Sequence, residues 1–256
     1  MRFVFDLDGT ICFKGAPVSE NLLACFGQLE KEGHEIIFAS ARPIRDMLPV
    51  LHERFYKHTL IGGNGSLISK DGKVIFSNAF TDEQVEKILF IIEKQNATYL
   101  IDSDWDYAYT GPSDHPILKN VDVNKLAKSV SVNDLNSIVK ILILTMDNYD
   151  DFVTELKPLN VVAHRHSNEN TIDISPKNID KWNALKKLGI EDHSYVAFGN
   201  DSNDLSMFQH SIHSVMIGDH KELAKYADER IQLDENCETN IIRKLMEIAE
   251  QYKHSI

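Results

Sequence analysis

The chain has 256 residues, 43% of them hydrophobic and 26% charged, which excludes the disordered, fibrous and collagenous classes of protein. Its 39 acidic and 27 basic residues give a net charge of −12, which disfavours nucleic acid and anionic membranes as partners. Three cysteines without metal-type spacing fit a reduced, cytoplasmic setting. We expect neither a signal peptide nor a membrane span, because Asp6 and Asp8 interrupt the first apolar run and later runs are short.

Short apolar runs alternate with helical patterns over the first eighty residues, as is typical of parallel strands joined by crossover helices. The predicted elements are strands at 3–5 and 35–39, a helix that begins at Ser19 and is closed by Gly33, and a helix from Pro43 to about Phe55. The glycine cluster at 62–65 demands unusual backbone angles. After it, a hairpin is expected to turn at Asp71-Gly72.

From Thr81 the pattern changes to that of an α+β unit. Thr81 and Gln84 resemble a capping box that opens a helix through Ile92, and strand-like segments follow. These segments are 98–101, 140–146 and 160–164. We therefore predict a separate α+β domain over residues 81–174.

Alternation of helix and strand returns from Asn178. The predicted elements are a helix that ends at Gly189, a strand at 195–198, a helix from Asn203, a strand at 214–217 and a terminal helix at 241–252. The predicted fold is therefore α/β. We expect a doubly wound, mostly parallel, Rossmann-like core of residues 1–80 and 175–256, with the α+β domain inserted in its middle.

Four segments place polar residues next to predicted strand ends, where ligands bind in such a sheet. They are Asp6-Leu7-Asp8-Gly9-Thr10, Ser40-Ala41-Arg42, the region of Lys181, and the run Gly199-Asn200-Asp201-Ser202-Asn203-Asp204. Two carboxylates one residue apart repel each other unless a cation lies between them, and Mg²⁺ is a cation that takes oxygen ligands. The alternative, that Asp6 and Asp8 merely begin a loop capped by Thr10, does not account for the other three segments.

In this order the segments resemble the motifs of the haloacid dehalogenase superfamily, and more closely its Cof-type phosphatases with a type II (C2) cap. Asp6 to Thr10 matches the DxDGT first motif, Ser40 the second-motif Ser/Thr, and Lys181 the third-motif lysine. The run 199–204 resembles the GDxxND fourth motif, and Asn64-Gly65-Ser66-Leu67-Ile68 resembles the NGA-x-I stretch of this subgroup. The resemblance covers nearly the whole chain.

The resemblance implies hydrolysis of a small phosphorylated metabolite, such as a sugar phosphate. Asp6 would attack phosphorus to form an aspartyl-phosphate, and Asp8 would act as general acid and then as general base. Ser40, Lys181 and Mg²⁺ would stabilise the phosphoryl group. The substrate would be bound by Leu7, Gly9, Thr10, Ser40, Ala41, Arg42, Lys181 and Asn203, and the metal by Asp6, Asp8, Asn200 and Asp201.

One departure concerns the metal site. Where the family pattern has Gly-Asp, this chain has Gly199-Asn200 followed by Asp201, and either side chain could contact the ion. Asp204 would support the fourth motif or cap a helix, and Arg42 would reach a phosphate or end a surface ion pair. Lys177 competes weakly with Lys181 for the third-motif position. His164 and His166 alternate on one strand, and we expect exposed histidines there rather than a metal site.

Two further functions stay open at this point. Within the enzyme class, the runner-up is phosphoryl transfer to a sugar, as in the related phosphomutases. In another class, the protein would be a phosphate-binding or phospho-accepting regulator without turnover. Asn200 favours the regulator weakly, and Asp8 argues against it, because a phospho-acceptor needs no acid two residues from its nucleophile. Neither the substrate nor the oligomeric state follows from the sequence.

Overall fold

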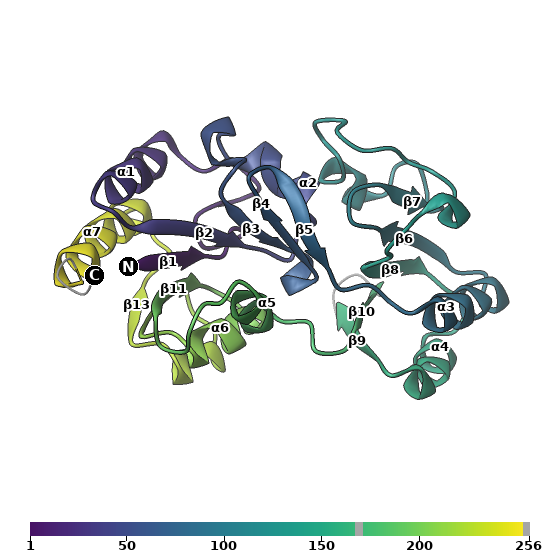
Figure 1. Ribbon diagram of the computed structural model, residues 1–256. Helices are drawn as coiled ribbons and strands as arrows, with labels where there is room; N and C mark the ends of the chain where they lie inside the picture. The colour runs from purple at the N-terminus through teal and green to yellow at the C-terminus, as the bar shows by residue number, and fades with distance from the viewer. Residues whose placement is uncertain (167–170, 253–256) are drawn as a thin grey trace.

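The computed structural model describes residues 1–166 and 171–252 and shows two lobes, each built on one β-sheet (Figure 1). The larger sheet orders its strands as β13 (Glu229–Ile231), β12 (His213–Ile217), β11 (Tyr195–Gly199), β1 (Arg2–Phe5), β2 (Glu35–Ala39), β3 (Thr59–Gly62), β4 (Leu67–Lys70) and β5 (Lys73–Ser77). The smaller sheet orders them as β7 (Tyr107–Tyr109), β6 (Thr98–Asp102), β8 (Lys140–Thr145), β10 (Thr171–Pro176) and β9 (Val161–His166).

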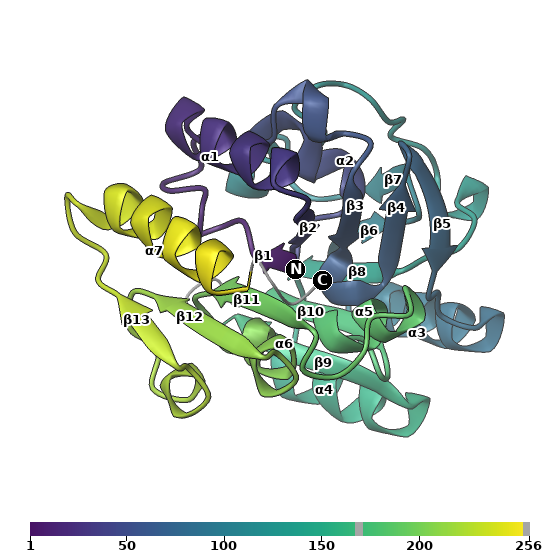
Figure 2. The ribbon, with the colours of Figure 1, turned by 60° about the vertical axis from the view of Figure 1, so that its left-hand side comes forward.

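The larger sheet is parallel from β13 to β3 and ends in the antiparallel strands β4 and β5. Helices α1 (Glu20–Lys31) and α7 (Cys237–Gln251) cover one face, and α5 (Lys181–Lys187) and α6 (Leu205–Gln209) cover the other (Figure 2). Both faces are therefore buried, and the central strand β1 is apolar on each: Phe3 and Phe5 on one side, Val4 on the other. The predicted doubly wound, mostly parallel fold is confirmed.

The smaller sheet is antiparallel, and its two helices lie on one face. Helices α3 (Asp82–Lys94) and α4 (Tyr149–Leu156) pack on that face, over the side chains of Ile101, Ile141, Ile143, Ile172 and Ile174. The opposite face carries Leu100 and Leu142. Strand β10 runs to Pro176, two residues beyond the expected domain end at 174. Residues 78–81 and 177–180 form the two connections between the lobes (Figure 1).

Helix α2 is much shorter than the helix expected from Pro43 to Phe55. It spans Ile44–Met47 and is followed by 3₁₀ turns at Leu48–Val50 and Glu53–Phe55, with Leu51 extended at ψ 151°. Pro49 accounts for the break, because proline lacks the N–H that a helix interior needs and its ring clashes with the preceding turn. The predicted extent of this helix was wrong.

The next two helices begin at local contacts. Helix α5 begins at Lys181, because the carboxylate of Asp180 accepts a hydrogen bond from the Asn183 N–H (2.8 Å) and so caps the helix. The helix expected from Asn203 opens as a 3₁₀ turn at Ser202–Asp204 before α6. Further 3₁₀ turns lie at Gly63–Gly65, Pro116–Lys119, Val132–Asp134, Lys157–Leu159 and Leu223–Lys225.

Local signals fixed other boundaries as expected. Ser19 caps α1 by accepting from the Leu22 N–H, and Thr81 forms the predicted capping box with Gln84. The hairpin between β4 and β5 turns at Asp71 and Gly72, both at positive φ. Among the helices of the described residues, none combines the length and apolar character needed to cross a bilayer.

Candidate active site

A buried lysine joins two carboxylates at the carboxyl end of the larger sheet. Lys181, fully buried at the start of α5, donates from Nζ to Asp6 Oδ1 (2.7 Å) and to Asp204 Oδ1 (2.6 Å). Asp6 follows β1 directly and Asp204 precedes α6, so side chains 175 and 23 residues away from Lys181 meet there. Lys177 is exposed. Of the two candidate lysines, the structure brings Lys181 to Asp6.

Charge in this group is balanced only in part, since two acids share one cation. Burial raises the pKa of Asp6 to about 7, against the lowering effect of the Lys181 ammonium. Burial alone would lower the pKa of Lys181, but the carboxylates of Asp204 and Asp6 outweigh it, so the pKa of Lys181 is raised. Lys181 therefore stays charged, while Asp6 gives up its proton less readily than an exposed aspartate.

The second oxygen of Asp6 faces Thr10 and, through it, Asn200. The buried Thr10 hydroxyl donates to Asp6 Oδ2 (2.9 Å) and lies 3.3 Å from Asn200 Oδ1. The loop that presents Thr10 is closed on the Leu7 carbonyl, which accepts from the N–H groups of residues 10, 11 and 12. Gly9 has φ +80°, and a Cβ there would lie 2.1 Å from Asn200 Nδ2. Glycine is thus required for the close approach of the first and fourth motifs.

Asp204 organises the fourth motif through both of its oxygens. Besides holding Lys181, it accepts the backbone N–H groups of Asn200 (2.8 Å) and Asp201 (3.2 Å) on Oδ2. It makes no side-chain capping bond to α6, but its bond from the Asp201 N–H is half of a capping box on the 3₁₀ turn that precedes α6, so it fills both roles raised by the sequence. The Asp201 carboxylate is 63% exposed, accepts from the Ser202 N–H and lies 3.3 Å from His220 Nε2. Of the two adjacent side chains, Asn200 is the one that the structure brings toward Asp6.

Asp8 lies at the mouth of the site rather than in its interior. Arg42 donates to both of its oxygens, from Nε to Oδ2 and from a terminal nitrogen to Oδ1, each at 2.7 Å. The same guanidinium donates to the Asp46 carbonyl oxygen (3.1 Å), and Ser40 Oγ accepts the Arg42 N–H (3.1 Å). Arg42 therefore joins the first and second motifs. Ala41 lies between Ser40 and Arg42, whose side chains make these bonds.

The glycine cluster positions α5. Gly65 has φ +111°, and a Cβ there would lie 2.3 Å from the carbonyl oxygen of Asp180, the residue that caps α5. Asn64 accepts a hydrogen bond on Oδ1 from Asn203 Nδ2 (3.0 Å). Asn203 is thus bound to the glycine cluster, and that cluster lies against the turn that presents Lys181.

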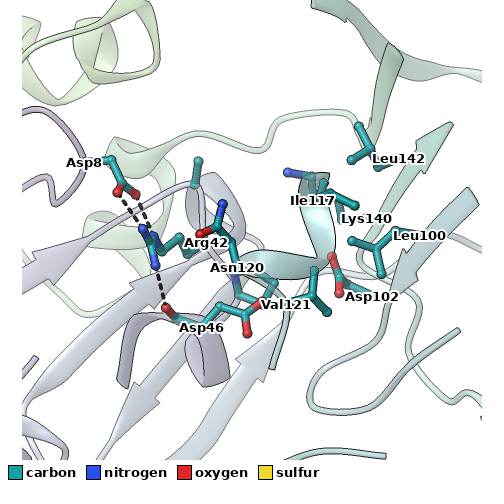
Figure 3. Close-up of a pocket in the computed structure, with 12 residues that line it drawn as sticks. Asp8, Arg42, Asp46, Leu100, Asp102, Ile117, Asn120, Val121, Lys140 and Leu142 are labelled. Carbon is teal, nitrogen blue, oxygen red and sulfur yellow. Dashed lines mark hydrogen bonds and ion pairs between the residues drawn. The ribbon is translucent and has the colours of Figure 1, made fainter. Parts of the chain in front are cut away.

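A cleft of about 320 Å³ separates the two lobes beside Asp8 (Figure 3). Three charged residues line it from the larger lobe, and four aliphatic residues with three polar or charged ones line it from the smaller lobe. The lining residues are Asp8, Ala41, Arg42, Pro43 and Asp46 from the larger lobe, and Leu100, Asp102, Ile117, Asn120, Val121, Lys140 and Leu142 from the smaller.

Sequence reasoning missed a group of charged residues between the lobes. Arg45, fully buried on α2, contacts the carboxylates of Asp46 and Asp102 and donates to the Trp105 carbonyl oxygen (2.9 Å). Asp46 accepts the Asp122 N–H (2.8 Å), and Lys140 pairs with Asp173 (2.9 Å). The pairs join residues up to 76 positions apart, and no local sequence signal links them.

Oxygen donors for a cation gather at Asp6 and Asn200, which share the Thr10 hydroxyl. A carboxylate and an amide oxygen suit a hard ion such as Mg²⁺. Within residues 1–166 and 171–252, the structure has no cluster of three or more His, Cys, Asp or Glu side chains suited to a metal. The side chains of His164 and His166 lie outside the described part of the chain, so the expectation for them stays a prediction.

Residues 3–254 match the family model of haloacid dehalogenase-like hydrolases. The chain is 22% identical over 260 residues to the 5-amino-6-(5-phospho-D-ribitylamino)uracil phosphatase YitU of Bacillus subtilis, covering 94% of this chain and 95% of that protein. A solved haloacid dehalogenase-like hydrolase from Bacteroides thetaiotaomicron has a TM-score of 0.79 at 19% identity, covering 96% of this chain and 98% of that one. The subclass IIB sugar phosphatase BT4131 has a TM-score of 0.71 at 18% identity, with 99% and 98% covered. The resemblance carried by the ordered motifs is thus confirmed, and the chain belongs to the haloacid dehalogenase-like hydrolases.

Proposed function

We propose that this chain is a Mg²⁺-dependent phosphatase that hydrolyses a small phosphomonoester through an aspartyl-phosphate on Asp6. The observation that carries the proposal is the buried ammonium of Lys181 between Asp6 and Asp204, beside the oxygen donors of Thr10 and Asn200. Relatives whose names state phosphatase activity on small phosphorylated compounds support the same reaction class.

Asp6 is suited to act as the nucleophile. Each of its oxygens accepts one hydrogen bond, from Lys181 or Thr10, so the carboxylate is oriented while lone pairs stay free for attack on phosphorus. Attack forms an Asp6–phosphorus bond and breaks the ester bond to the leaving oxygen. The Lys181 ammonium offsets negative charge on the phosphoryl oxygens, and the buried Ser40 hydroxyl would donate to one of them.

Asp8 is suited to transfer the proton. It stands at the cleft mouth, where a leaving group would emerge, and two hydrogen bonds from Arg42 hold it there. To protonate the leaving oxygen, Asp8 must be released from Arg42 and take up a proton. It then takes a proton from the water that cleaves the aspartyl-phosphate. Arg42, once free, is placed to bind a phosphoryl oxygen.

Asp6 and Asn200 would hold the magnesium ion, with Asp8 and Asp201 as the further candidates that the sequence named. Asp6 and Asn200 both contact the Thr10 hydroxyl, whereas the carboxylates of Asp8 and Asp201 lie toward Arg42 and His220, so Asp6 and Asn200 have the stronger claim. When bound, Mg²⁺ would screen the charges of Asp6 and the phosphate from each other.

The leaving group would occupy the cleft between the lobes (Figure 3). We propose residues 1–80 and 175–256 as the catalytic core and residues 81–174 as its cap. The cap side of the cleft presents Leu100 and Leu142 next to Lys140 and Asp102, which suits a compact metabolite with both apolar and hydrogen-bonding parts. A cytoplasmic setting remains our prediction.

The test is phosphate release from a panel of phosphorylated sugars, nucleotides and cofactors, with Mg²⁺ and with a chelator. We expect metal-dependent release that Asp6→Asn abolishes and that Asp8→Asn lowers by about 10²- to 10⁴-fold. Phosphate appearing on an added sugar instead of in solution would favour the phosphomutase alternative. Stable labelling of Asp6 without turnover of any ester would favour the regulator, and neither labelling nor turnover would refute the proposal.

A further inference from the structure

A second hollow, which shares no lining residue with the cleft beside Asp8, lies where the chain passes between the two lobes. It measures about 590 Å³ and is lined by Asn78, Lys177, Asn178, Asn183, Lys186 and Lys187. Asn78 belongs to the first connection between the lobes, Lys177 and Asn178 belong to the second, and the other three lie on α5. Three cations and three amides therefore face one space, and no acidic side chain lines it.

Several lysines of the described residues pair with acids, and the three lysines of the hollow do not. Lys87, Lys94 and Lys140 each pair with an acid, as do two further lysines near the C-terminus. Lys177, Lys186 and Lys187 have no acid partner within the described residues, although the chain carries 39 acidic residues and a net charge of −12. Three unpaired ammonium groups repel one another, and an anion between them relieves that repulsion.

Two of the lysines are held in place by aromatic rings. Lys187 Nζ lies 4.4 Å from the centroid of Phe76, and Lys186 Nζ lies 5.7 Å from that of Trp182. Asn183 donates from Nδ2 to the Asn178 carbonyl oxygen (3.3 Å) and to the Asp180 carboxylate, which fastens the second connection to α5. Asp180 adds one negative charge near the hollow, so the local excess is two positive charges. That excess is matched by a doubly charged ligand.

We propose that this hollow binds a small dianionic oxyanion of the chemistry of inorganic phosphate, apart from the substrate phosphate at Asp6. Three ammonium groups and the Asn78 and Asn178 amides supply the hydrogen-bond donors that such an ion needs. The bound ion contacts both connections and α5 together. The site does not depend on phosphatase activity, because within the described residues none of its side chains hydrogen-bonds or pairs with Asp6, Lys181 or Asp204.

Binding is tested by titrating the ¹⁵N-labelled full chain with inorganic phosphate in the presence of a chelator, followed by amide chemical shifts. We expect saturable shifts at residues 78, 177, 178 and 183, and no such shifts with chloride at equal ionic strength. Shifts confined to the surroundings of Asp6 would overturn the proposal, as would equal responses to chloride and phosphate.

Two matched triple variants distinguish the effect of the lysines in the hollow from the effect of the protein's net charge on phosphate binding. Lys177→Gln/Lys186→Gln/Lys187→Gln should weaken phosphate binding at the hollow about tenfold. Lys31→Gln/Lys70→Gln/Lys73→Gln removes the same number of charges from exposed lysines elsewhere and should leave the affinity within about twofold. Equal loss in both triple variants would refute a built site. Phosphate release from esters, measured in parallel, reports on the proposed function separately.

Discussion

Lys181 and Asp204 depend on each other for the charges that they carry. Both side chains are fully buried, and an ionised group in such a place is costly unless a partner of opposite charge faces it. Asp204 also accepts two backbone N–H groups of the fourth motif, so it fixes a loop and a cation together. A neutral amide in its place cannot do both.

Replacing Asp204 by Asn should therefore destabilise the protein strongly. The Asn Nδ2 donor would face either the Lys181 ammonium or the backbone N–H groups, and we expect a loss of about 3 kcal/mol in the free energy of unfolding. Urea denaturation at neutral pH measures it. Asp201→Asn is the matched control, because that carboxylate is 63% exposed, and its cost should stay below about 0.5 kcal/mol. Equal costs for the two variants would contradict the assigned role of Asp204.

Asp46 gives a pH dependence of stability with a definite sign. Burial raises the pKa of Asp46 to about 6, against the lowering effect of Arg45 and of the Asp122 N–H, while the charges of Asp102 and Asp122 add to the rise. The folded state thus binds the proton more tightly than the unfolded state, whose Asp has a pKa of about 3.9. Stability contributed by this proton is present at low pH and is lost as the pH rises to about 6.

The comparison that isolates this effect is wild type against Asp46→Asn at pH 4.5 and 7.5. Between these values wild type should lose about 2 kcal/mol of unfolding free energy relative to the variant, because the Asn has no proton to release. Asp134→Asn, at an exposed position, should follow wild type at both pH values. If the difference between wild type and Asp46→Asn were independent of pH, Asp46 would not carry the raised pKa.

At the scale of single elements, Gly65 links the glycine cluster at 62–65 to the start of α5. Its φ of +111° is one that side chains rarely adopt, and the Asp180 carbonyl oxygen occupies the space where a Cβ would lie. Any displacement of Asp180 is passed to Lys181, the next residue. The glycine cluster therefore influences the position of Lys181 without contacting its side chain.

Gly65→Ala should lower both stability and phosphate release. Besides the strain of a positive φ, the added methyl group must push Asp180 away, and a displacement near 1 Å at Lys181 should lower turnover about 10²-fold. Gly72→Ala is the control: it has φ +75°, but the nearest atom to its Cβ would be Lys57 Cγ at 4.0 Å. It should cost about 1 kcal/mol and leave turnover unchanged. Equal turnover in the two variants would show that Gly65 does not position Lys181.

Elements with a local signal could be predicted, and those fixed by distant contacts could not. The helix starts at Ser19 and Thr81 and the hairpin turn at Asp71-Gly72 are each determined by residues within four positions of the boundary. All three lie where the sequence predicted them. The predicted extent of the second helix was wrong because its apolar spacing continues past Pro49, whereas the α-helix ends at Met47 and a 3₁₀ turn follows. Strands β7 and β13 are three residues long and were not predicted, since they are recognised only by their pairing with β6 and β12.

The candidate site follows the same division. Parallel strand ends share one edge of the sheet, so Asp6, Ser40 and the fourth motif could be expected to meet there from sequence order alone. Arg45 could not be assigned, because its partners Asp102 and Trp105 lie in the inserted segment at distances along the chain that no motif encodes. The choice of Asn200 over Asp201 likewise depended on where Thr10 lies.

At the scale of the whole molecule, Arg45 holds the two lobes together. Its guanidinium contacts Asp46 of the larger lobe and Asp102 and the Trp105 carbonyl oxygen of the smaller, and it lies 4.9 Å over the Tyr107 ring. Removing one partner of a buried ion pair costs about 3–5 kcal/mol, because the other charge is left without compensation. The lobes should therefore unfold together only while Arg45 is present.

The chain's two tryptophans, Trp105 in the smaller lobe and Trp182 in the larger, allow this coupling to be measured. With Trp182→Phe or Trp105→Phe as background, fluorescence during urea unfolding reports on the surroundings of one tryptophan at a time. With Arg45 present, the transitions reported by the two tryptophans should coincide. In Arg45→Met, the transition reported by Trp105 should have its midpoint at a lower urea concentration than the transition reported by Trp182. Arg54→Met, whose side chain is 42% exposed, is the control and should keep the two transitions together. Coincident transitions in Arg45→Met would mean that apolar contacts, rather than this buried cation, couple the lobes.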